Sequence, residues 1–252
     1  MKRILSLLSP FLPFSFVAHL LSFPTLAQQG TVEYKTTMMG GPQAVSSTST
    51  MYYAKGNVRT EINVALPGVS RSMKQTILLL ANKPNTLYML NEANRTYSET
   101  SLKDAEKATG AQNITVTVIG KEKIKNLNTT HAEVKIGQGT MDVWTTKEIP
   151  GYADMQALMR ANRSMGNANL YEELKKKGAD GFFVRMATST GRGEMLMELE
   201  RYDTKPVAAS LFQIPSDYKK VDAPDPAGMM NMSPAERQKF MQEMQKRQKS
   251  RQ

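Results

Sequence analysis

The chain carries few side chains that could perform covalent chemistry. It has no cysteine and two histidines, and one of these, His19, lies in the apolar N-terminal stretch. His131 alone cannot supply a Cys/His nucleophile pair or the His/Cys cluster of a zinc site. The turn Met39-Gly40-Gly41-Pro42 lacks the lysine and the helix of a phosphate-binding loop. We therefore expect no enzyme activity, no metal site and no cofactor.

Two polar patterns can be interpreted either as ordinary solvated strand faces or as catalytic groups. His131 alternates with Glu133 and Lys135, which is typical of a solvated strand face. Glu198 and Glu200 are two residues apart, so a strand would place both carboxylates on one face. Paired carboxylates can act as acid and base, but the same spacing is common on exposed strands. Carboxylate catalysis remains an open, minor alternative.

Methionine is unusually frequent, with 18 in the chain. Thioethers bind Cu(I), and the closely spaced Met229, Met230 and Met232 could do so. Met195 and Met197 instead fit a buried strand face, where flexible methionines fill irregular space or line an adaptable apolar surface. Core or lining positions are favoured, and soft-metal binding is the alternative.

The first 27 residues have the features of a secretory signal. Lys2 and Arg3 precede an apolar run without acidic residues that ends in Thr25-Leu26-Ala27. Prolines interrupt this run, which argues against a retained membrane helix. We expect cleavage before Gln28, export to the periplasm or medium, and a mature chain without a lipid-bearing cysteine.

From Gln28 to Val221, apolar and polar residues alternate with period two, which predicts strands with one buried face. Short turns rich in Gly and Asn separate the runs, so consecutive strands must be antiparallel. The expected fold is mainly β (α+β), a large antiparallel sheet of about ten strands. The expected strands are 32–37, 50–54, 58–64, 75–81, 86–90, 95–100, 113–120, 131–136, 140–146, 182–189 and 194–200.

Helical periodicity is confined to three short segments and the C-terminal tail. The segments are 101–109, 152–163 and 170–177, the last ended by Gly178. Residues 222–252 form a Pro/Gly linker and a basic helix. The net charge of the whole chain is +10, and it is +8 without Lys2 and Arg3 of the leader. The last twenty residues contribute +4 of this +8. The tail is either a solubilising helix or a contact for an anionic membrane, and we expect no nucleic-acid partner.

Several motifs carry a family resemblance. They are Val118-Ile-Gly-Lys-Glu-Lys-Ile124, Val143-Trp-Thr-Thr-Lys-Glu-Ile-Pro150, and the earlier stretches 51–61 and 87–97. Their order resembles a family of exported bacterial envelope proteins, a domain of unknown function with a fold like the lipoprotein carrier LolA and the lipoprotein LppX. The resemblance covers most of residues 30–220. The chain departs from it in carrying Asn126 where such hairpins often have glycine, and in lacking a lipobox.

That resemblance implies a strongly curved half-barrel whose concave apolar face is covered by helices, with space for an acyl chain. We expect the helix 153–163 to lie across this face. The predicted ligand-lining residues are Trp144, Met155, Leu158, Met159, Ile62, Met195 and Met197. The expected function is binding of a lipid or other apolar ligand without catalysis. The alternative is a structural protein with a filled core, or an interaction protein with an envelope partner.

Overall fold

A computed structural model describes residues 29–40, 44–65, 73–102, 113–152, 170–190 and 193–222. Twelve strands form one sheet. They are β1 (Gln29–Met39), β2 (Val45–Ala54), β3 (Asn57–Ala65), β4 (Met73–Leu79), β5 (Thr86–Asn91), β6 (Thr96–Ser101), β7 (Ile114–Ile124), β8 (Leu127–Ile136), β9 (Gly139–Thr146), β10 (Phe182–Thr190), β11 (Gly193–Asp203) and β12 (Lys219–Lys220). All eleven predicted strands are present, and only the two-residue β12 was not foreseen.

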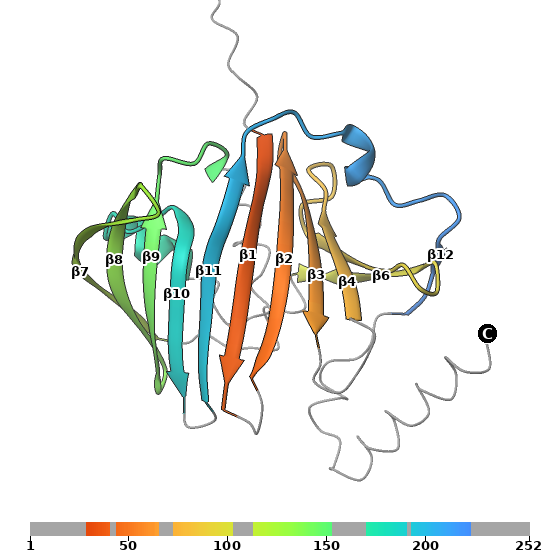
Figure 1. Ribbon diagram of the computed structural model, residues 1–252. Coiled ribbons are helices and arrows are strands. Elements are labelled where there is room, and N and C mark those ends of the chain that lie inside the picture. Colours follow the sequence, from red (N-terminus) through yellow and green to blue (C-terminus); the bar gives the residue numbers. More distant parts are fainter. Residues whose placement is uncertain are drawn as a thin grey trace, which may run out of the picture.

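The strand order places the beginning of the chain in the middle of the sheet. It runs β12-β6-β5-β4-β3-β2-β1-β11-β10-β9-β8-β7 (Figure 1). Hairpins lead outward from β1 to β6, and the chain then crosses to β7. It returns by hairpins to β9, by a longer connection through α3 to β10, and by a last hairpin to β11, which pairs with β1. All pairs are antiparallel except β12 with β6, so the predicted open, mainly antiparallel sheet is confirmed. The long return of the chain to the β6 edge permits the parallel pair.

Two tight hairpins depend on residues with positive φ. In the β2–β3 turn, Lys55 and Gly56 have φ of 50° and 75°, and in the β7–β8 turn Lys125 and Asn126 have φ of 48° and 67°. Two-residue turns of this kind match the twist of the flanking strands. Asparagine tolerates the left-handed conformation better than most residues, so Asn126 takes the place that glycine holds in similar hairpins.

The sheet is strongly curved, with its convex face toward the viewer in Figure 1 and helix α3 (Leu170–Lys176) on the far, concave side. Leu170 and Leu174 of α3 are buried against Val134 and Val143 of the sheet. The helix ends where Gly178 adopts φ 69° and the Ala179 amide donates to the Leu174 carbonyl. The prediction for 170–177 is confirmed. The predicted helices 101–109 and 152–163 lie largely, and the tail helix entirely, outside the described residues.

A second apolar cluster lies on the concave side of the central strands. Tyr53 is at its centre, with its ring centroid 5.6 Å from that of Phe182. The Tyr53 hydroxyl donates to the Pro150 carbonyl at 2.5 Å, so it ties the loop after β9 to the sheet. Gly151 follows directly, at φ 92°, where an added Cβ would lie 1.9 Å from the Tyr53 ring. Only glycine allows the loop to approach this closely.

The convex face is also covered at one end. After β11 the chain crosses to the β3–β6 region through the 3-10 helix η2 (Ala209–Phe212) (Figure 1). Ile214 and Tyr218 pack there against Leu78, Tyr88 and Leu90. The amides of Lys219 and Val221 then donate to carbonyls of the β6 region, which forms β12. A short strand thus shields the β6 edge.

Candidate ligand-binding face

Register across the central strands assigns each side chain to one of two faces. Tyr34 of β1 pairs with Ser49 of β2, which pairs with Ile62 of β3, and on the other side Tyr34 pairs with Leu199 of β11. Directly paired residues point to the same side of a sheet. These four side chains therefore share the concave face with Val32 and Met51, two members of the Tyr53 cluster.

Three of the predicted lining residues lie on this concave face. Met195 and Met197 of β11 pair with Met38 and Thr36 of β1, and Ile62 lies two strands further along the sheet order. All three are half-buried, unlike Val32 of β1 and Tyr53 of β2 on the same face, which are fully buried. Met155, Leu158 and Met159, predicted to face them, lie outside the described residues.

Trp144 lies on the opposite face and does not belong to this set. It pairs with His131 and Arg185, whereas its neighbour Val143 pairs with Ala132 on the concave face. The indole stacks on the His131 ring with centroids 4.2 Å apart, and the Arg185 guanidinium lies 5.5 Å from the Trp144 centroid. Its N–H donates to Glu122. Trp144 is one residue out of phase with the buried Val143 and Thr145, so alternation turns it toward the convex side.

Sequence reasoning missed the residue with the most informative environment on the concave face. Tyr34 is 6% exposed, and its hydroxyl has no hydrogen-bond partner among the described residues. Burial, and to a lesser degree Tyr53, raises the pKa of Tyr34, so the hydroxyl stays protonated. Buried polar groups are nearly always paired. The available signal was a tyrosine in phase with the buried residue Val32 of the same strand.

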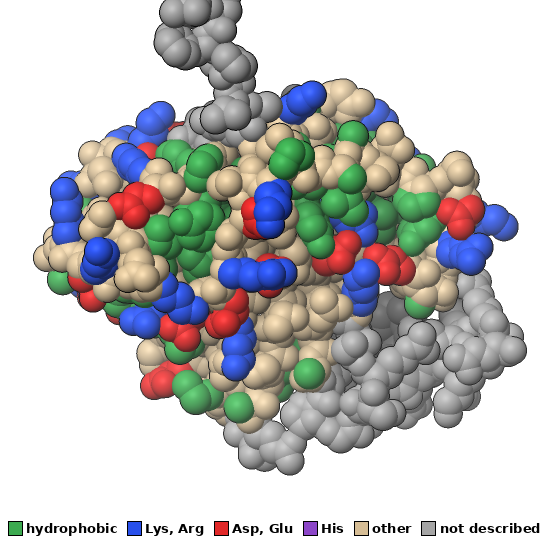
Figure 2. Space-filling view, turned by 45° about the horizontal axis from the view of Figure 1, so that its top comes forward, with side chains coloured by type: hydrophobic (Ala, Val, Ile, Leu, Met, Phe, Trp, Pro, Cys, Tyr) green, Lys and Arg blue, Asp and Glu red, His purple; other side chains and the backbone are tan. Residues whose placement is uncertain are grey.

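The convex face instead carries charges that are paired with one another. Figure 2 shows positive and negative side chains interspersed over it. Arg59 contacts Glu61 at 2.7 Å and Glu92 at 3.3 Å, and Lys74 contacts the same two carboxylates at 3.4 and 2.9 Å. Partial burial raises the pKa of Glu92, but the hydrogen bond and charge of Lys74 outweigh it and leave the pKa below its usual value. The two cations and two carboxylates of this cluster therefore neutralise one another.

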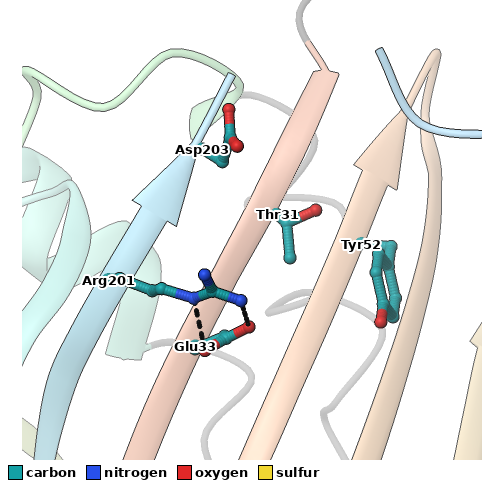
Figure 3. A pocket seen from close by; sticks show the side chains of 5 residues that line it. All are labelled: Thr31, Glu33, Tyr52, Arg201 and Asp203. Atoms are coloured by element: carbon teal, nitrogen blue, oxygen red, sulfur yellow. Dashed lines mark hydrogen bonds and ion pairs between the residues drawn. The ribbon is translucent and has the colours of Figure 1, made fainter. Parts of the chain in front are cut away.

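The convex face also has a shallow hollow in which charged side chains are paired with each other. Thr31, Glu33, Tyr52, Arg201 and Asp203 line it (Figure 3). Arg201 donates two hydrogen bonds to Glu33, at 2.7 and 2.6 Å, which lower the pKa of that carboxyl. Burial, followed by the charge of Glu61, raises the pKa of Tyr52. With the guanidinium already engaged by a carboxylate, the hollow offers no uncompensated charge to a ligand.

The carboxylates considered for catalysis are held by separate cations. Arg185 donates to Glu198 at 3.1 and 3.0 Å, whereas Glu200 lies 3.8 Å from the Lys125 ammonium. His131 bonds to Asp142 at 2.8 Å. Within the described ranges, no three His, Cys, Asp or Glu side chains are grouped as a metal site, and no helix has the length and apolarity to cross a membrane.

These features define the class of protein: an open, curved antiparallel sheet with an apolar concave face and a charge-paired convex face. The chain belongs to the family described as "Domain of unknown function (DUF4412)", which matches residues 29–218. The expectation of such a family, with a large curved sheet, is confirmed. A search of curated proteins finds no match.

Solved structures show distant similarity. PNGF-II has 13% identity and a TM-score of 0.38, over 78% of this chain and 32% of that one. LprF from Mycobacterium bovis has 13% identity and a TM-score of 0.33, over 76% and 91%. The MucA/MucB complex of Pseudomonas aeruginosa gives 8% identity and a TM-score of 0.37, over 76% and 58%. The chain spans about a third of the PNGF-II chain.

Proposed function

We propose that this is an exported envelope protein that binds a lipid or similar apolar ligand on the concave face, without catalysis. The observation that carries the proposal is the buried hydroxyl of Tyr34, which has no hydrogen-bond partner in the described part of the chain. A buried hydroxyl on a face that carries no charged pair suits an amphipathic ligand, whose ester or carboxyl oxygen can accept its hydrogen bond. The ligand chain would then extend along the half-buried end of the face.

The side chains around this end fit a ligand of variable shape. From Tyr34, β1 continues through Thr36 to Met38, which is 51% exposed, and the neighbouring β11 carries Met197 and Met195 on the same face. Thioether side chains are flexible and polarizable, so they can repack around acyl chains of different lengths. The convex face is less suited, since its charges are already neutralised in pairs.

Lipid binding is tested first on protein purified from the envelope. Native mass spectrometry should show a co-purifying lipid. After delipidation, displacement of a fluorescent fatty acid should give a Kd in the micromolar range, about −8 kcal/mol. Trp144 fluorescence is not the readout, since the indole faces the convex side.

Two neighbouring substitutions on β11 discriminate between the faces. Met197→Asp places a carboxylate on the concave face and should weaken fatty-acid binding at least tenfold. Leu196→Asp is the matched control, because Leu196 pairs with Thr37 and Ala187 on the convex face, and it should bind normally. Equal effects of both substitutions, or no binding by the parent protein, would contradict the proposal and favour a structural protein or one that binds an envelope partner.

Export is a separate part of the proposal, supported by the charge and apolar pattern of residues 1–27. N-terminal sequencing of the protein from the envelope fraction should begin at Gln28. Recovery of protein that retains Met1 would refute the export assignment, whatever the result of the lipid titration.

A further inference from the structure

Strand register brings together methionines that are far apart in the sequence. Met38 of β1 pairs directly with Met195 of β11, and Met197 of β11 pairs directly with Met186 of β10. Met195 and Met197 are two residues apart on one strand and share a face. The result is a zigzag of four methionines across three adjacent strands of the concave face, which we call the methionine ladder.

The ladder connects solvent with the protein interior. Met38 at its outer end is 51% exposed, Met195 is half-buried, and Met186 and Met197 pack against the apolar cluster that includes Val134 and Val143. An ion that binds at the exposed Met38 is therefore only one or two ladder positions away from thioethers that are partly shielded from water.

The spacing allows several thioethers to share one ion. Cα atoms of directly paired residues in antiparallel strands are about 4.5–5.5 Å apart, and residues two apart on a strand are about 6.8 Å apart. Methionine has three rotatable side-chain bonds, so sulfurs from Met195, Met197 and either paired methionine can converge.

The surroundings select the type of metal. The nearest same-face partners, Thr36 and Thr188, are uncharged. The ion pairs of Arg185 with Glu198 and of Arg201 with Glu33 lie on the opposite face. Neutral thioether ligands without carboxylate or imidazole disfavour hard divalent cations and suit soft monovalent ones. We propose that the methionine ladder is a binding site for Cu(I), with Ag(I) as its redox-inert substitute.

This site uses part of the proposed lipid-binding face but does not depend on lipid binding. The two functions separate chemically, because Met→Leu substitutions remove a sulfur and retain apolar volume. A Met195→Leu/Met197→Leu protein should lose affinity for the soft metal, and this loss is measured on delipidated protein in the absence of fatty acid. Failure of one proposal therefore leaves the other intact.

The test is an Ag(I) titration of the mature full-length protein with 13C-labelled methionine methyl groups. The ladder methyl resonances should shift, with saturation near one equivalent. Anaerobic competition with a chromophoric Cu(I) chelator should show at least a tenfold loss of affinity in the Met195→Leu/Met197→Leu variant. Met89→Leu, on β5 beyond three intervening strands, should retain parental affinity.

A second variant tests whether the closely spaced methionines at 229–232 bind the metal instead of the ladder. Met229→Leu/Met230→Leu/Met232→Leu should leave Cu(I) affinity unchanged. The proposal is overturned if the tail methyl groups shift instead of the ladder, or if the β11 double variant binds Cu(I) as tightly as the parent. Since the methyl shifts are measured on the unaltered protein, they decide the matter even if a variant folds poorly.

Discussion

At the scale of single residues, the concave face combines tight packing with a buried tyrosine hydroxyl that has no partner among the described residues. Tyr34 and Tyr53 lie on this face in adjacent strands, β1 and β2. Yet the Tyr53 hydroxyl donates to the Pro150 carbonyl, whereas that of Tyr34 has no partner among the described residues. The two tyrosines therefore make opposite contributions, one to folding and the other to the proposed binding.

We expect Tyr34→Phe to maintain or raise the free energy of unfolding, by up to about 1–2 kcal/mol, because it removes a buried group without a partner. The same change should weaken fatty-acid binding by about 0.5–1.5 kcal/mol, up to roughly tenfold. Chemical denaturation and fluorescent-ligand displacement measure the two effects. Tyr53→Phe is the control: it should lose about 1 kcal/mol of stability. If Tyr34→Phe bound the fatty acid as tightly as the parent protein, the Tyr34 hydroxyl would not be part of the binding site.

Gly151 provides a prediction about the loop after β9. Gly151→Ala should destabilise the protein by about 2–4 kcal/mol, because φ is 92° and the new Cβ would lie 1.9 Å from the Tyr53 ring. Thermal unfolding should show a lower Tm. Gly120→Ala is the matched control, since an added Cβ there has nothing within 4 Å. A Gly151→Ala protein as stable as Gly120→Ala would mean that the loop does not pack on Tyr53.

At the scale of elements, the segment after β11 acts as a cover for one end of the convex face. Its Ile214 and Tyr218 bury Leu78, Tyr88 and Leu90, and the Leu211 carbonyl accepts a hydrogen bond from Arg59. β12 then continues along the β6 edge. The fold thus extends through residue 221, where the Val221 amide donates to the Tyr97 carbonyl.

Two truncations should have different effects on stability. Removal of residues 223–252 should change the Tm by no more than a few degrees, because the cover and β12 remain. Truncation after residue 204 should lower it by ten degrees or more, since Leu78, Tyr88 and Leu90 lose their apolar cover. Differential scanning calorimetry compares the two proteins. A large loss in the longer one would show that the basic tail contributes to the folded domain.

At the scale of the whole molecule, the two faces of the sheet differ in the side chains that they carry. Apolar residues gather on the concave side under α3, whereas the convex side pairs its charges across strands, as Glu33 does with Arg201 and Glu92 with Lys74. The net charge of +10 therefore does not describe the sheet surface, where opposite charges alternate.

These cross-strand pairs predict a decline in stability at acidic pH. The pKa values of Glu33 and Glu92 are lowered in the folded protein from 4.5. A carboxylate with a depressed folded-state pKa stabilises above its unfolded pKa, and this stabilisation is lost as the pH falls through the folded-state pKa. The Tm should stay constant from neutral pH to about pH 5 and fall below about pH 4.5.

The double variant Glu33→Gln/Glu92→Gln should have a lower Tm at pH 7 and a shallower decline below pH 4.5 than the parent, as measured by thermal unfolding at each pH. Glu194→Gln is the control, since Glu194 makes no ion pair with the described residues. An identical pH profile for the double variant and the parent would show that other carboxylates govern the acid transition.

The sequence by itself determined the strands, their antiparallel hairpins and helix 170–176, because alternation, turn residues and a C-terminal glycine act over a few neighbouring residues. It also placed Met195 and Met197 correctly on the buried face of their strand. It misplaced Trp144, because an aromatic residue in a strand is as compatible with a stacked, charge-lined convex face as with an apolar one.

Only the tertiary structure decided which residues meet across the sheet. Pairing of β1 with β11 joins positions more than 150 residues apart, such as Met38 with Met195, and no local pattern fixes that register. The same long-range pairing buries Tyr34, whose hydroxyl finds no partner within the described ranges, and aligns the methionine ladder. Both proposed sites depend on register between strands remote in sequence, which is set by burial of the whole face rather than by the residues of either strand alone.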